Sequence, residues 1–286
     1  MAIGSTIHTW FEGQWRQGNT PILGAADHAT WLGTLVFDGA RRFEGRTPDL
    51  DRHFERVNRS AVALGLTPTV TVDDMLAICA EGLSRFAPDE AVYIRPMYWS
   101  VDSGPNAVLA DPDSTAFALC LEATPMPPAN APQRLATTRF TRPTLACATV
   151  DAKAACLYPN NARMLREVIA KGFTNALAGD SLGNVAETAT ANVFMVRDGE
   201  CLTPVPNGTF LNGITRQRII GLLRADGHRV LETTLSFDDF RQADEIFMTG
   251  NMSKVSPVVA LDDRAYEIGP MARRARELYW DWSHGR

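Results

Sequence analysis

The chain has 286 residues, of which 45% are hydrophobic and 21% charged, as in an ordinary globular protein long enough for two compact domains. Its formal net charge of −5 removes the electrostatic reason to expect a nucleic-acid partner, because such partners are bound by concentrated positive charge. We see no apolar window as long as a membrane span and no targeting segment, so we expect a cytoplasmic protein without membrane or nucleic-acid partners.

Five cysteines are spread along the chain in an odd number and without CxxC pairs. Most lie inside apolar runs, so we expect reduced, buried thiols and neither a disulfide framework nor a zinc site. No metal is therefore predicted. The five are Cys79, Cys120, Cys147, Cys156 and Cys201.

The first 122 residues predict strands interleaved with two helices. Residues 7–15 alternate around a glycine turn, which indicates a β-hairpin. Residues 31–43 are rich in β-branched and aromatic side chains and predict strand structure. Apolar residues recur at helical spacing over 50–64. The remaining elements predicted in this part are a helix over 72–86 and strands over 91–99 and 115–121.

A proline-rich segment divides the chain. Residues 123–132 contain four prolines in ten residues, a density that neither a helix nor a central strand tolerates. We therefore predict a small N-terminal domain over 1–122, a linker over 123–133 and a larger C-terminal domain over 134–286.

The larger domain also mixes strands and helices. Without an internal repeat, two mixed blocks indicate an α+β or mixed α/β protein. The predicted strands cover 134–138, 184–196, 229–233 and 245–249, and the predicted helices cover 161–176, 213–225, a short stretch from Ser236, and 269–282.

Lysine is rare in this chain, because 25 of the 28 basic residues are arginine and the lysines are Lys153, Lys171 and Lys254. Arginine stays protonated, whereas a desolvated lysine can lose its proton and attack a carbonyl. Lys153 has small and apolar neighbours, which favours a partly buried, reactive amine. A solvated charge at the end of a strand is the alternative.

Two features predict an anion site. Gly213-Ile214-Thr215 opens a helix, so free backbone N–H groups and a hydroxyl can gather around a phosphate, although a plain helix cap is the alternative. Arg56 lies on the apolar-leaning side of its helix and needs an anion there. An intramolecular aspartate or glutamate would satisfy this arginine as well.

Glu187 is a carboxylate among small residues in a strand-rich run, and buried carboxylates require partners. A turn, cap or ion-pair role is the alternative. A lysine for an aldehyde, a carboxylate for a ring nitrogen, and a helix N-terminus with an arginine for a phosphate together meet the needs of pyridoxal 5′-phosphate (PLP).

The chain resembles the fold-type IV PLP-dependent aminotransferases, and among them the branched-chain amino-acid aminotransferases. The resemblance covers nearly the whole chain. It is carried by Val36-Phe37-Asp38-Gly39-Ala40-Arg41, His53-Phe54-Glu55-Arg56-Val57, Tyr93-Ile94-Arg95-Pro96, Lys153 with Tyr158, Glu187 with Asn192-Val193-Phe194, Gly213-Ile214-Thr215-Arg216, and Glu245-Ile246-Phe247-Met248-Thr249-Gly250.

The resemblance implies a small N-terminal α/β domain and a larger cofactor-binding domain around a β-barrel-like sheet. It also implies a homodimer in which an N-terminal loop reaches the partner's site. Lys153 would form the Schiff base and carry the proton, Glu187 would hold the pyridine nitrogen protonated, and Tyr158 would bond the phenolic oxygen. The remaining cofactor contacts implied are Arg56, Gly213, Ile214, Thr215 and Asn251 around the phosphate and Leu211 on the ring face.

For the substrate, the resemblance implies that Tyr93 and Arg95 recognise the α-carboxylate and that Phe37, Gly39 and Arg41 form the pocket strand. An arginine can bind a carboxylate through two hydrogen bonds. A cross-strand ion pair is the alternative for Arg95. The expected reaction transfers an amino group between an L-branched-chain amino acid and a 2-oxo acid such as 2-oxoglutarate.

Several residues depart from the family pattern. Leu32 replaces a pocket tyrosine, Leu157 an asparagine, Thr188 a glycine, and Asn251 a threonine that helps hold phosphate. Asn251 can still donate a hydrogen bond, so the cofactor chemistry is expected to persist. The departures leave an (R)-amine or D-amino-acid transaminase open as the alternative, with an aminodeoxychorismate lyase as a further relative of this fold.

A non-catalytic binding protein is the alternative from another class. A degenerate site has no reason to keep a lysine in a chain that otherwise uses arginine. The retention of Lys153, Glu187 and Arg56 together therefore favours an enzyme.

Overall fold

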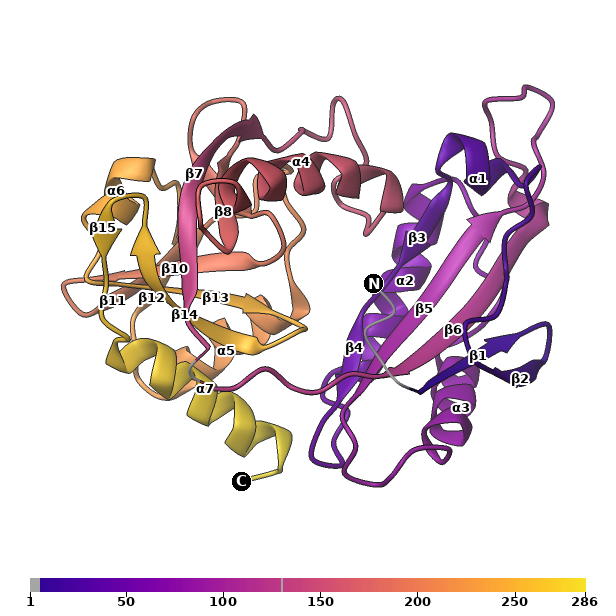
Figure 1. The fold of residues 1–286 in the computed structure, drawn as a ribbon, viewed down its shortest axis with the longest axis horizontal. Helices are drawn as coiled ribbons and strands as arrows, with labels where there is room; N and C mark the ends of the chain where they lie inside the picture. Colours follow the sequence, from indigo (N-terminus) through magenta and orange to yellow (C-terminus); the bar gives the residue numbers. More distant parts are fainter. Residues whose placement is uncertain (1–5, 130) are drawn as a thin grey trace. The chain divides into compact units, whose positions relative to one another are not determined.

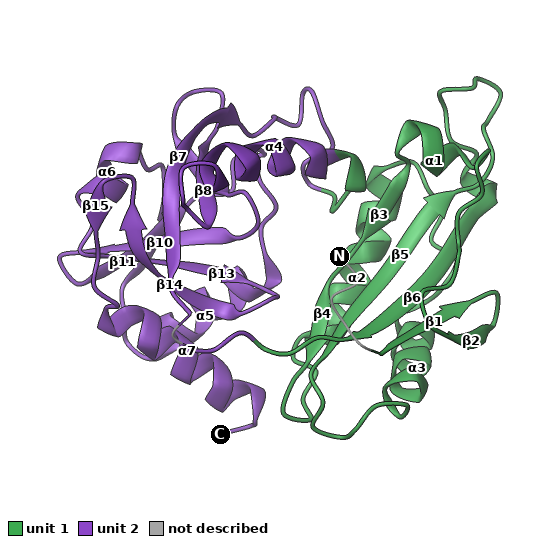
Figure 2. Cartoon of the chain, in the orientation of Figure 1, with its two compact units in different colours: residues 1–126, 152–156 green, residues 127–151, 157–286 purple. Residues whose placement is uncertain are grey.

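The computed structural model describes residues 6–129 and 131–286, which fold into two compact units (Figures 1 and 2). The first unit contains the described residues up to Met126 together with Ala152–Cys156. The second contains Pro127–Asp151 and Leu157–Arg286. One boundary between the units therefore falls inside the proline-rich segment, and a second pair of boundaries isolates the short stretch that carries Lys153.

An antiparallel sheet of six strands forms the frame of the first unit, in the order β2-β1-β6-β5-β3 with β4 also paired to β5. The first two strands form the predicted hairpin. The strands are β1 (Ile7–Phe11), β2 (Gln14–Gln17), β3 (Leu35–Phe37), β4 (Ala40–Arg42), β5 (Val92–Ser100) and β6 (Thr115–Ala123).

Two amphipathic helices of the first unit pack on this sheet, α2 (Leu50–Ala63) on β3 and β5, and α3 (Val72–Leu83) on β1 and β6. The predicted apolar stripe of α2 is fully buried at Phe54, Val57 and Ala61. The strand prediction over 31–43 is wrong at its start, because Trp31 and Leu32 end the short helix α1 (His28–Leu32). Gly33, at φ 74°, terminates that helix in the left-handed conformation.

A curled sheet of nine strands forms the core of the second unit, in the order β12-β11-β10-β13-β14-β7-β8-β9, with β15 on β14. The last strand, β9, also contacts β10, so the sheet bends back on itself as a barrel-like sheet would. The strands are β7 (Gln133–Thr141), β8 (Asn175–Gly179), β9 (Val185–Thr188), β10 (Asn192–Arg197), β11 (Glu200–Pro204), β12 (Val230–Thr233), β13 (Glu245–Gly250), β14 (Lys254–Leu261) and β15 (Arg264–Ala265).

Helices cover this second sheet. α4 (Tyr158–Ile169) packs on β7 and β8, while α5 (Ile214–Ala225) and α7 (Pro270–Ser283) pack on each other and on β13. The short helix α6 (Phe237–Arg241) lies where a helix from Ser236 was predicted, and the Ser236 side chain caps it. The three-residue 3₁₀ turns η1 (Pro112–Ser114) and η2 (Ala155–Leu157) complete the described elements.

The helix prediction over 161–176 is wrong at its C-terminal end. The helix stops at Ile169, and the chain turns through Gly172 at φ 84°. Asn175–Gly179 then form β8, in which every residue is buried. A strand buried on both faces shows no alternation, so its apolar run was indistinguishable from a continuing helix.

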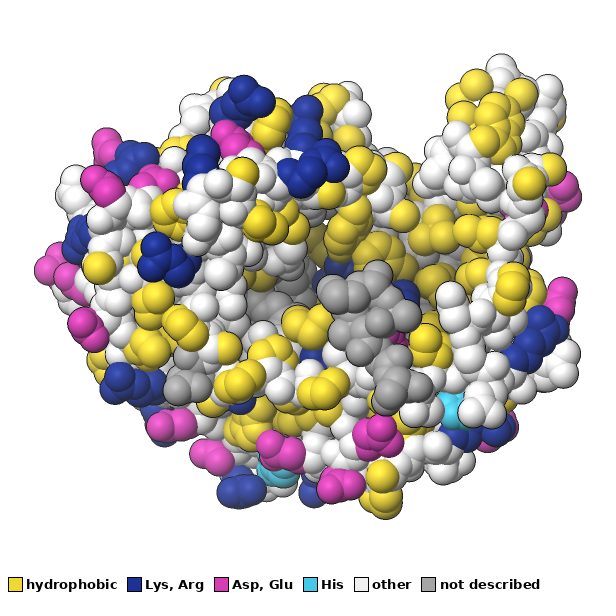
Figure 3. All heavy atoms as spheres, viewed as in Figure 1, with side chains coloured by type: hydrophobic (Ala, Val, Ile, Leu, Met, Phe, Trp, Pro, Cys, Tyr) yellow, Lys and Arg dark blue, Asp and Glu magenta, His cyan; other side chains and the backbone are white. Residues whose placement is uncertain are grey.

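Basic and acidic side chains are interspersed over the face shown in Figure 3. Cys79, Cys120 and Cys201 are buried thiols as expected, but Cys147 and Cys156 are exposed, which corrects the prediction for those two. Among residues 6–129 and 131–286, we find no helix that is both long enough and apolar enough to span a bilayer.

Candidate functional site

Lys153 is held against the edge of the first unit's sheet. Ala154 bridges Val36 in antiparallel fashion, and the backbone N–H of Phe37 donates to the carbonyl of Lys153 at 3.1 Å. The N–H of Lys153 donates to Ser60 Oγ on α2, also at 3.1 Å. These contacts fix the backbone of Lys153 and so the point from which its side chain extends. The side-chain Nζ lies 4.9 Å from the centroid of the Phe37 ring. Two predicted site residues, Lys153 and Phe37, are thus brought together.

A buried network surrounds Arg56. Its Nε and Nη2 donate to the two carboxylate oxygens of Asp38 at 2.6 and 2.8 Å, and His53 Nδ1 lies 2.7 Å from the same carboxylate. Asp38 also accepts the N–H of Gly39 at 2.7 Å. The intramolecular carboxylate left open as an alternative is therefore present. A phosphate contact of Arg56 remains a prediction, and Asp38 fixes the guanidinium from which it would be made.

The charge of Asp38 depends on these partners. Burial alone would raise the pKa of the carboxyl group, since this side chain has no solvent exposure. The positive charges of Arg56 and His53, with their hydrogen bonds, outweigh burial and hold the pKa of Asp38 well below its ordinary value. The ion pair is consequently intact at neutral pH.

The loop between β3 and β4 is shaped around a tyrosine. A Cβ atom at Gly39 would lie 2.2 Å from Tyr93 Oη, so only glycine leaves room for that hydroxyl. Arg41 is fully buried and donates to the carbonyls of Thr124 and, at 3.0 Å, Pro125. Burial lowers the pKa of Arg41 to about 10, against a smaller opposing effect of Tyr93. Gly39, Arg41 and Tyr93 thus form one cluster.

Arg95 forms the cross-strand ion pair that was left open as its alternative role. Its Nη2 lies 3.3 Å from Glu122 Oε2, and its guanidinium lies 4.9 Å from the centroid of the Tyr93 ring. The Arg95 side chain keeps 34% of its surface exposed, whereas that of Glu122 keeps 5%. Recognition of a substrate carboxylate by Arg95 remains a prediction.

In the second unit, Glu187 is buried and paired with an arginine that sequence reasoning missed. Arg142 Nε lies 3.1 Å from Glu187 Oε1, and this guanidinium is anchored by Asn161 and by the carbonyl of Thr209. The two opposite charges offset the cost of burying either. The only signal in the sequence was that a buried carboxylate needs a partner, and no spacing connects positions 142 and 187.

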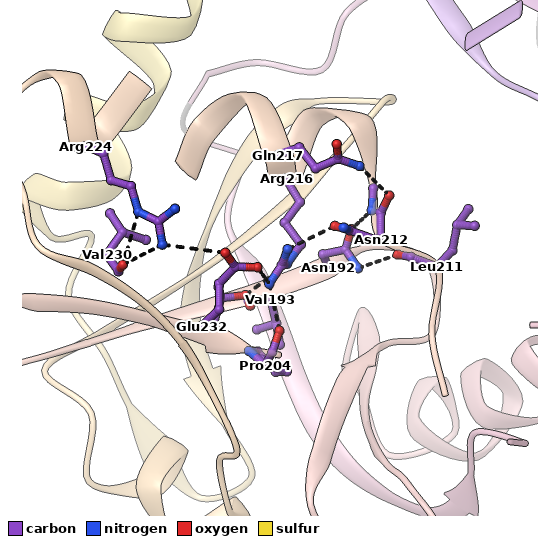
Figure 4. A network of polar contacts seen from close by, with 12 residues as sticks. Asn192, Val193, Pro204, Leu211, Asn212, Arg216, Gln217, Arg224, Val230 and Glu232 are labelled. Atoms are coloured by element: carbon purple, nitrogen blue, oxygen red, sulfur yellow. Dashed lines mark hydrogen bonds and ion pairs between the residues drawn. The ribbon is translucent and has the colours of Figure 1, made fainter. Parts of the chain in front are cut away.

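Asn192 joins Glu187 to the loop that precedes α5. Figure 4 shows Asn192 beside this loop. Its Nδ2 donates to Glu187 Oε2 at 3.3 Å and to the carbonyl of Leu211 at 3.0 Å. Its Oδ1 accepts the N–H of Gly213 at 3.1 Å. A Cβ at Gly213 would lie 2.2 Å from this Oδ1, so the contact requires glycine. Asn192 belonged to a family motif in the sequence, but no role had been predicted for it.

The middle residue of the same loop, Asn212, is also held in place (Figure 4). Arg216 Nη1 donates to Asn212 Oδ1 at 2.9 Å, and Gln217 Nε2 donates to its carbonyl at 3.0 Å. Arg216 is fully buried and is itself anchored to the carbonyl of Pro204 at 2.7 Å and to Glu232 at 3.0 Å. The conformation of the loop is therefore also stabilised by two residues of α5, Arg216 and Gln217.

The N-terminus of α5 suits an anion. Helix geometry leaves the N–H groups of its first turn, at Ile214, Thr215 and Arg216, without partners four residues earlier. No side chain caps this end, whose N-cap residue is Gly213. The predicted phosphate residues thus lie at an uncapped helix N-terminus, where N–H groups and the helix dipole favour negative charge.

Two further donors lie near this helix end. Thr249, on β13, is directly opposite Asn192 on β10, and Asn251 follows β13. Thr249 Oγ1 and Asn251 Nδ2 are buried atoms without a hydrogen-bond partner among the described residues. Orphaned buried donors are costly, and a phosphate would satisfy them. The second unit therefore fits the phosphate and ring-nitrogen requirements of PLP.

Two further predicted residues, Tyr158 and Leu32, lie at helix ends. Tyr158 starts α4 and is 36% exposed, and Leu32 is 37% exposed at the end of α1. In Figure 4 the side chain of Leu211 points away from Asn192. Thr188, which departs from the family pattern, bonds the N–H and carbonyl of Ala191 at 3.0 and 2.7 Å and so closes the β9–β10 turn.

Residues 35–261 match the sequence pattern of the class IV amino-transferase family. This range covers most of the chain and includes every predicted site residue except Leu32. The chain belongs to the class IV aminotransferases. The fold agrees, since the mixed α/β architecture with its curled sheet superimposes on solved fold-type IV aminotransferases.

Among solved structures similar to this class IV aminotransferase, an aminotransferase from Brucella abortus bound to the co-factor PLP is 62% identical, with a TM-score of 0.96 and coverage of 98% of this chain and 99% of that one. A branched-chain aminotransferase from Thermoproteus uzoniensis, solved with norvaline, is 25% identical, with a TM-score of 0.90 and coverage of 98% and 96%. The branched-chain-amino-acid aminotransferase of Pseudomonas aeruginosa is 29% identical over 97% of this chain and 93% of its own.

We predict that Asp38→Asn weakens the protein most at neutral pH. Losing the buried charge leaves Arg56 without its counter-ion, which should lower the free energy of unfolding by about 3 kcal/mol. Because folding lowers the pKa of Asp38, its stabilisation is present above the ordinary value of 3.8 and declines below it. Urea unfolding at pH 7 and pH 3 should therefore show a smaller difference between the two proteins at pH 3.

Asp51→Asn is the matched control, because Asp51 is exposed in the first turn of α2. It should change stability little at either pH. A difference between wild type and Asp38→Asn that stays constant across this range would contradict the assigned ion pair.

Proposed function

We propose that this class IV aminotransferase uses PLP to transfer an amino group between an L-branched-chain amino acid and a 2-oxo acid such as 2-oxoglutarate. One observation carries the proposal. Asn192 ties the buried carboxylate of Glu187 to the Gly213 amide that precedes the uncapped N-terminus of α5. A carboxylate for a ring nitrogen and an anion site for a phosphate are thereby fixed relative to each other, as one PLP molecule requires.

PLP as the cofactor is also supported by the comparisons. The Brucella abortus aminotransferase, 62% identical over almost the whole chain, binds it. When bound, PLP supplies an aldehyde that captures amines and a ring that withdraws electrons from the reacting carbon.

The protein residues would hold and protonate the reactants. Lys153 Nζ would attach the cofactor and then move the proton at the substrate α-carbon. Glu187, paired with Arg142, would keep the ring nitrogen protonated, and Tyr158 would bond the phenolic oxygen. The phosphate would be held by the residues predicted from the sequence: Arg56, Gly213, Ile214, Thr215 and Asn251.

The substrate assignment rests on the first unit. Arg95, partly exposed beside Tyr93, would bind the α-carboxylate, while Phe37, Gly39 and Arg41 would border the side chain. The names of the Thermoproteus and Pseudomonas relatives support a branched-chain donor. Leu32 supports the second candidate, an (R)-amine or D-amino-acid transaminase, because branched-chain enzymes usually have a tyrosine at this position.

We also propose that the enzyme is a cytoplasmic homodimer. Large apolar side chains are exposed in the first unit at Trp31 (56%), Val108 (72%) and Leu109 (61%). The loop between β5 and β6, which forms the tip at the upper right of Figure 3, carries hydrophobic side chains. A second subunit would cover such residues. Five cysteines without a disulfide among them fit a reducing compartment.

We expect borohydride treatment of the PLP-loaded protein to lock the cofactor onto Lys153. Peptide mass mapping should find the adduct there and on neither Lys171 nor Lys254. Lys153→Ala should lose the visible absorbance of the bound cofactor. An adduct on another lysine, or none, would contradict the proposed attachment.

Glu187→Ala should retain PLP, since the phosphate contacts remain, but slow proton removal from the substrate. The uncharged ring accepts electrons poorly, and we expect a loss of about 3 kcal/mol in transition-state stabilisation, roughly a hundredfold in rate. Stopped-flow half-reactions would measure this rate, and wild-type turnover would remove Glu187 from the mechanism.

A donor screen tests the substrate. L-leucine should give the fastest half-reaction, ahead of D-alanine and (R)-1-phenylethylamine, with 2-oxoglutarate and pyruvate compared as acceptors. A preference for D-alanine or the (R)-amine would replace the branched-chain proposal with the second candidate. The cofactor assignment would be unaffected.

A further inference from the structure

Lys254 is a fully buried lysine at the start of β14, with 1% of its surface exposed. Its backbone lies in the left-handed region at φ 62°, which is unfavourable for a residue with a side chain. A buried ammonium is also unfavourable without partners. Two unfavourable features at one position indicate that specific contacts hold this lysine in place.

Those contacts come from the turn itself and from α7. Lys254 Nζ donates to Asn251 Oδ1 at 2.7 Å and lies 5.7 Å from the centroid of the Tyr279 ring. Arg276, one turn earlier on α7, donates to the carbonyl of Ser253 at 3.1 Å. The turn from Asn251 to Lys254 is therefore braced by the C-terminal helix.

The lysine determines which way the Asn251 amide points. An asparagine amide has one acceptor oxygen and two donor hydrogens. Turned around, it would place its NH₂ group against the ammonium of Lys254, and two donors cannot bond each other. Oδ1 must face Lys254, and Nδ2 is then presented on the other side of the amide. Nδ2 is the buried atom without a partner among the described residues.

The surroundings of Asn251 belong to the proposed phosphate site. A Cβ at the preceding Gly250 would lie 3.3 Å from that of Ala191, and Thr249 is opposite Asn192. Asn192 in turn holds the Gly213 amide at the start of α5. Hydrogen-bond donors thus come together from adjacent segments: the uncapped end of α5, Thr249 Oγ1 and Asn251 Nδ2. A phosphate oxygen would accept from them.

We propose that Lys254 is a positioning residue for the cofactor phosphate. Lys254 permits only one orientation of the Asn251 side-chain amide. Nδ2 is therefore oriented as a donor before the phosphate binds, and the amide need not turn on binding. This inference rests on the proposed function, because it assigns a role within the same site. It concerns an asparagine–lysine pair at a place where the family pattern has a threonine.

The test is a titration of cofactor-free protein with PLP, followed by tryptophan fluorescence. Lys254→Met keeps the volume and removes the ammonium, and we expect the Kd for PLP to rise about tenfold. Lys171→Met is the matched control, since Lys171 is exposed and pairs at the surface with Glu167. It should leave the Kd within about twofold.

Two comparisons separate positioning from a general loss of structure. Pyridoxal, which lacks the phosphate, should bind wild type and Lys254→Met alike. In an Asn251→Ala background, Lys254→Met should have no further effect on the Kd for PLP, because the residue through which it acts is gone. A persistent tenfold effect in that background would overturn the positioning role, and so would an equal loss of pyridoxal binding.

If Lys254→Met does not fold, Asn251→Asp is the variant whose Kd for PLP is measured instead. Its carboxylate satisfies Lys254 but cannot donate, so PLP should bind at least about tenfold more weakly. An unchanged Kd in Asn251→Asp, or in a folded Lys254→Met, overturns this inference alone. Failure of the wild-type protein to bind PLP would overturn the proposed function instead.

Discussion

The geometry of the second unit depends on the side-chain amide of Asn192. This residue uses Nδ2 to hold Glu187 and the Leu211 carbonyl, and Oδ1 to hold the Gly213 amide. A carboxylate on one strand and the start of a helix are thereby fixed by one rigid planar group. Because one amide contacts both the Glu187 carboxylate and the start of α5, these two groups cannot shift independently, as they could if separate residues held them. The glycine at 213 is a consequence, because a side chain there would collide with the amide oxygen.

Three buried arginines, one in the first unit and two in the second, are paired with carboxylates. Arg56 pairs with Asp38, Arg142 with Glu187, and Arg216 with Glu232. Arginine suits such positions because its planar fork makes several directed bonds and it stays charged when buried. The arginine bias of the composition therefore has a structural counterpart. Of the three lysines, Lys254 is buried and bonded to Asn251, whereas Lys171 is exposed beside Glu167.

Local pattern explains which features could be predicted from the sequence. The apolar period of residues 50–64 predicted α2 to within one residue, and the short helix predicted from Ser236 is α6. Pairings between distant positions left no such trace. Asp38 and Arg56 come from a loop and a helix, and Arg142 and Glu187 from either side of α4, so only the folded chain reveals them.

Other misses have equally physical reasons. The residues of β8 are all buried, so the strand lacked the alternation by which strands are recognised. Leu32 was assigned to a strand from its neighbours, but it ends a five-residue helix too short to show a period. The role of Asn192 could not be inferred from its motif alone, because it follows from three contacts made with separate segments.

The return of residues 152–156 to the first unit has a consequence for how the chain can be divided. A fragment ending in the proline-rich segment would lack Ala154 as the partner of Val36 and the backbone bonds to Phe37 and Ser60. The edge of its sheet would be left with open hydrogen-bonding groups, which invite association with other chains. The N-terminal unit is thus completed by a segment made later in synthesis, and neither unit corresponds to one uninterrupted piece of the gene product.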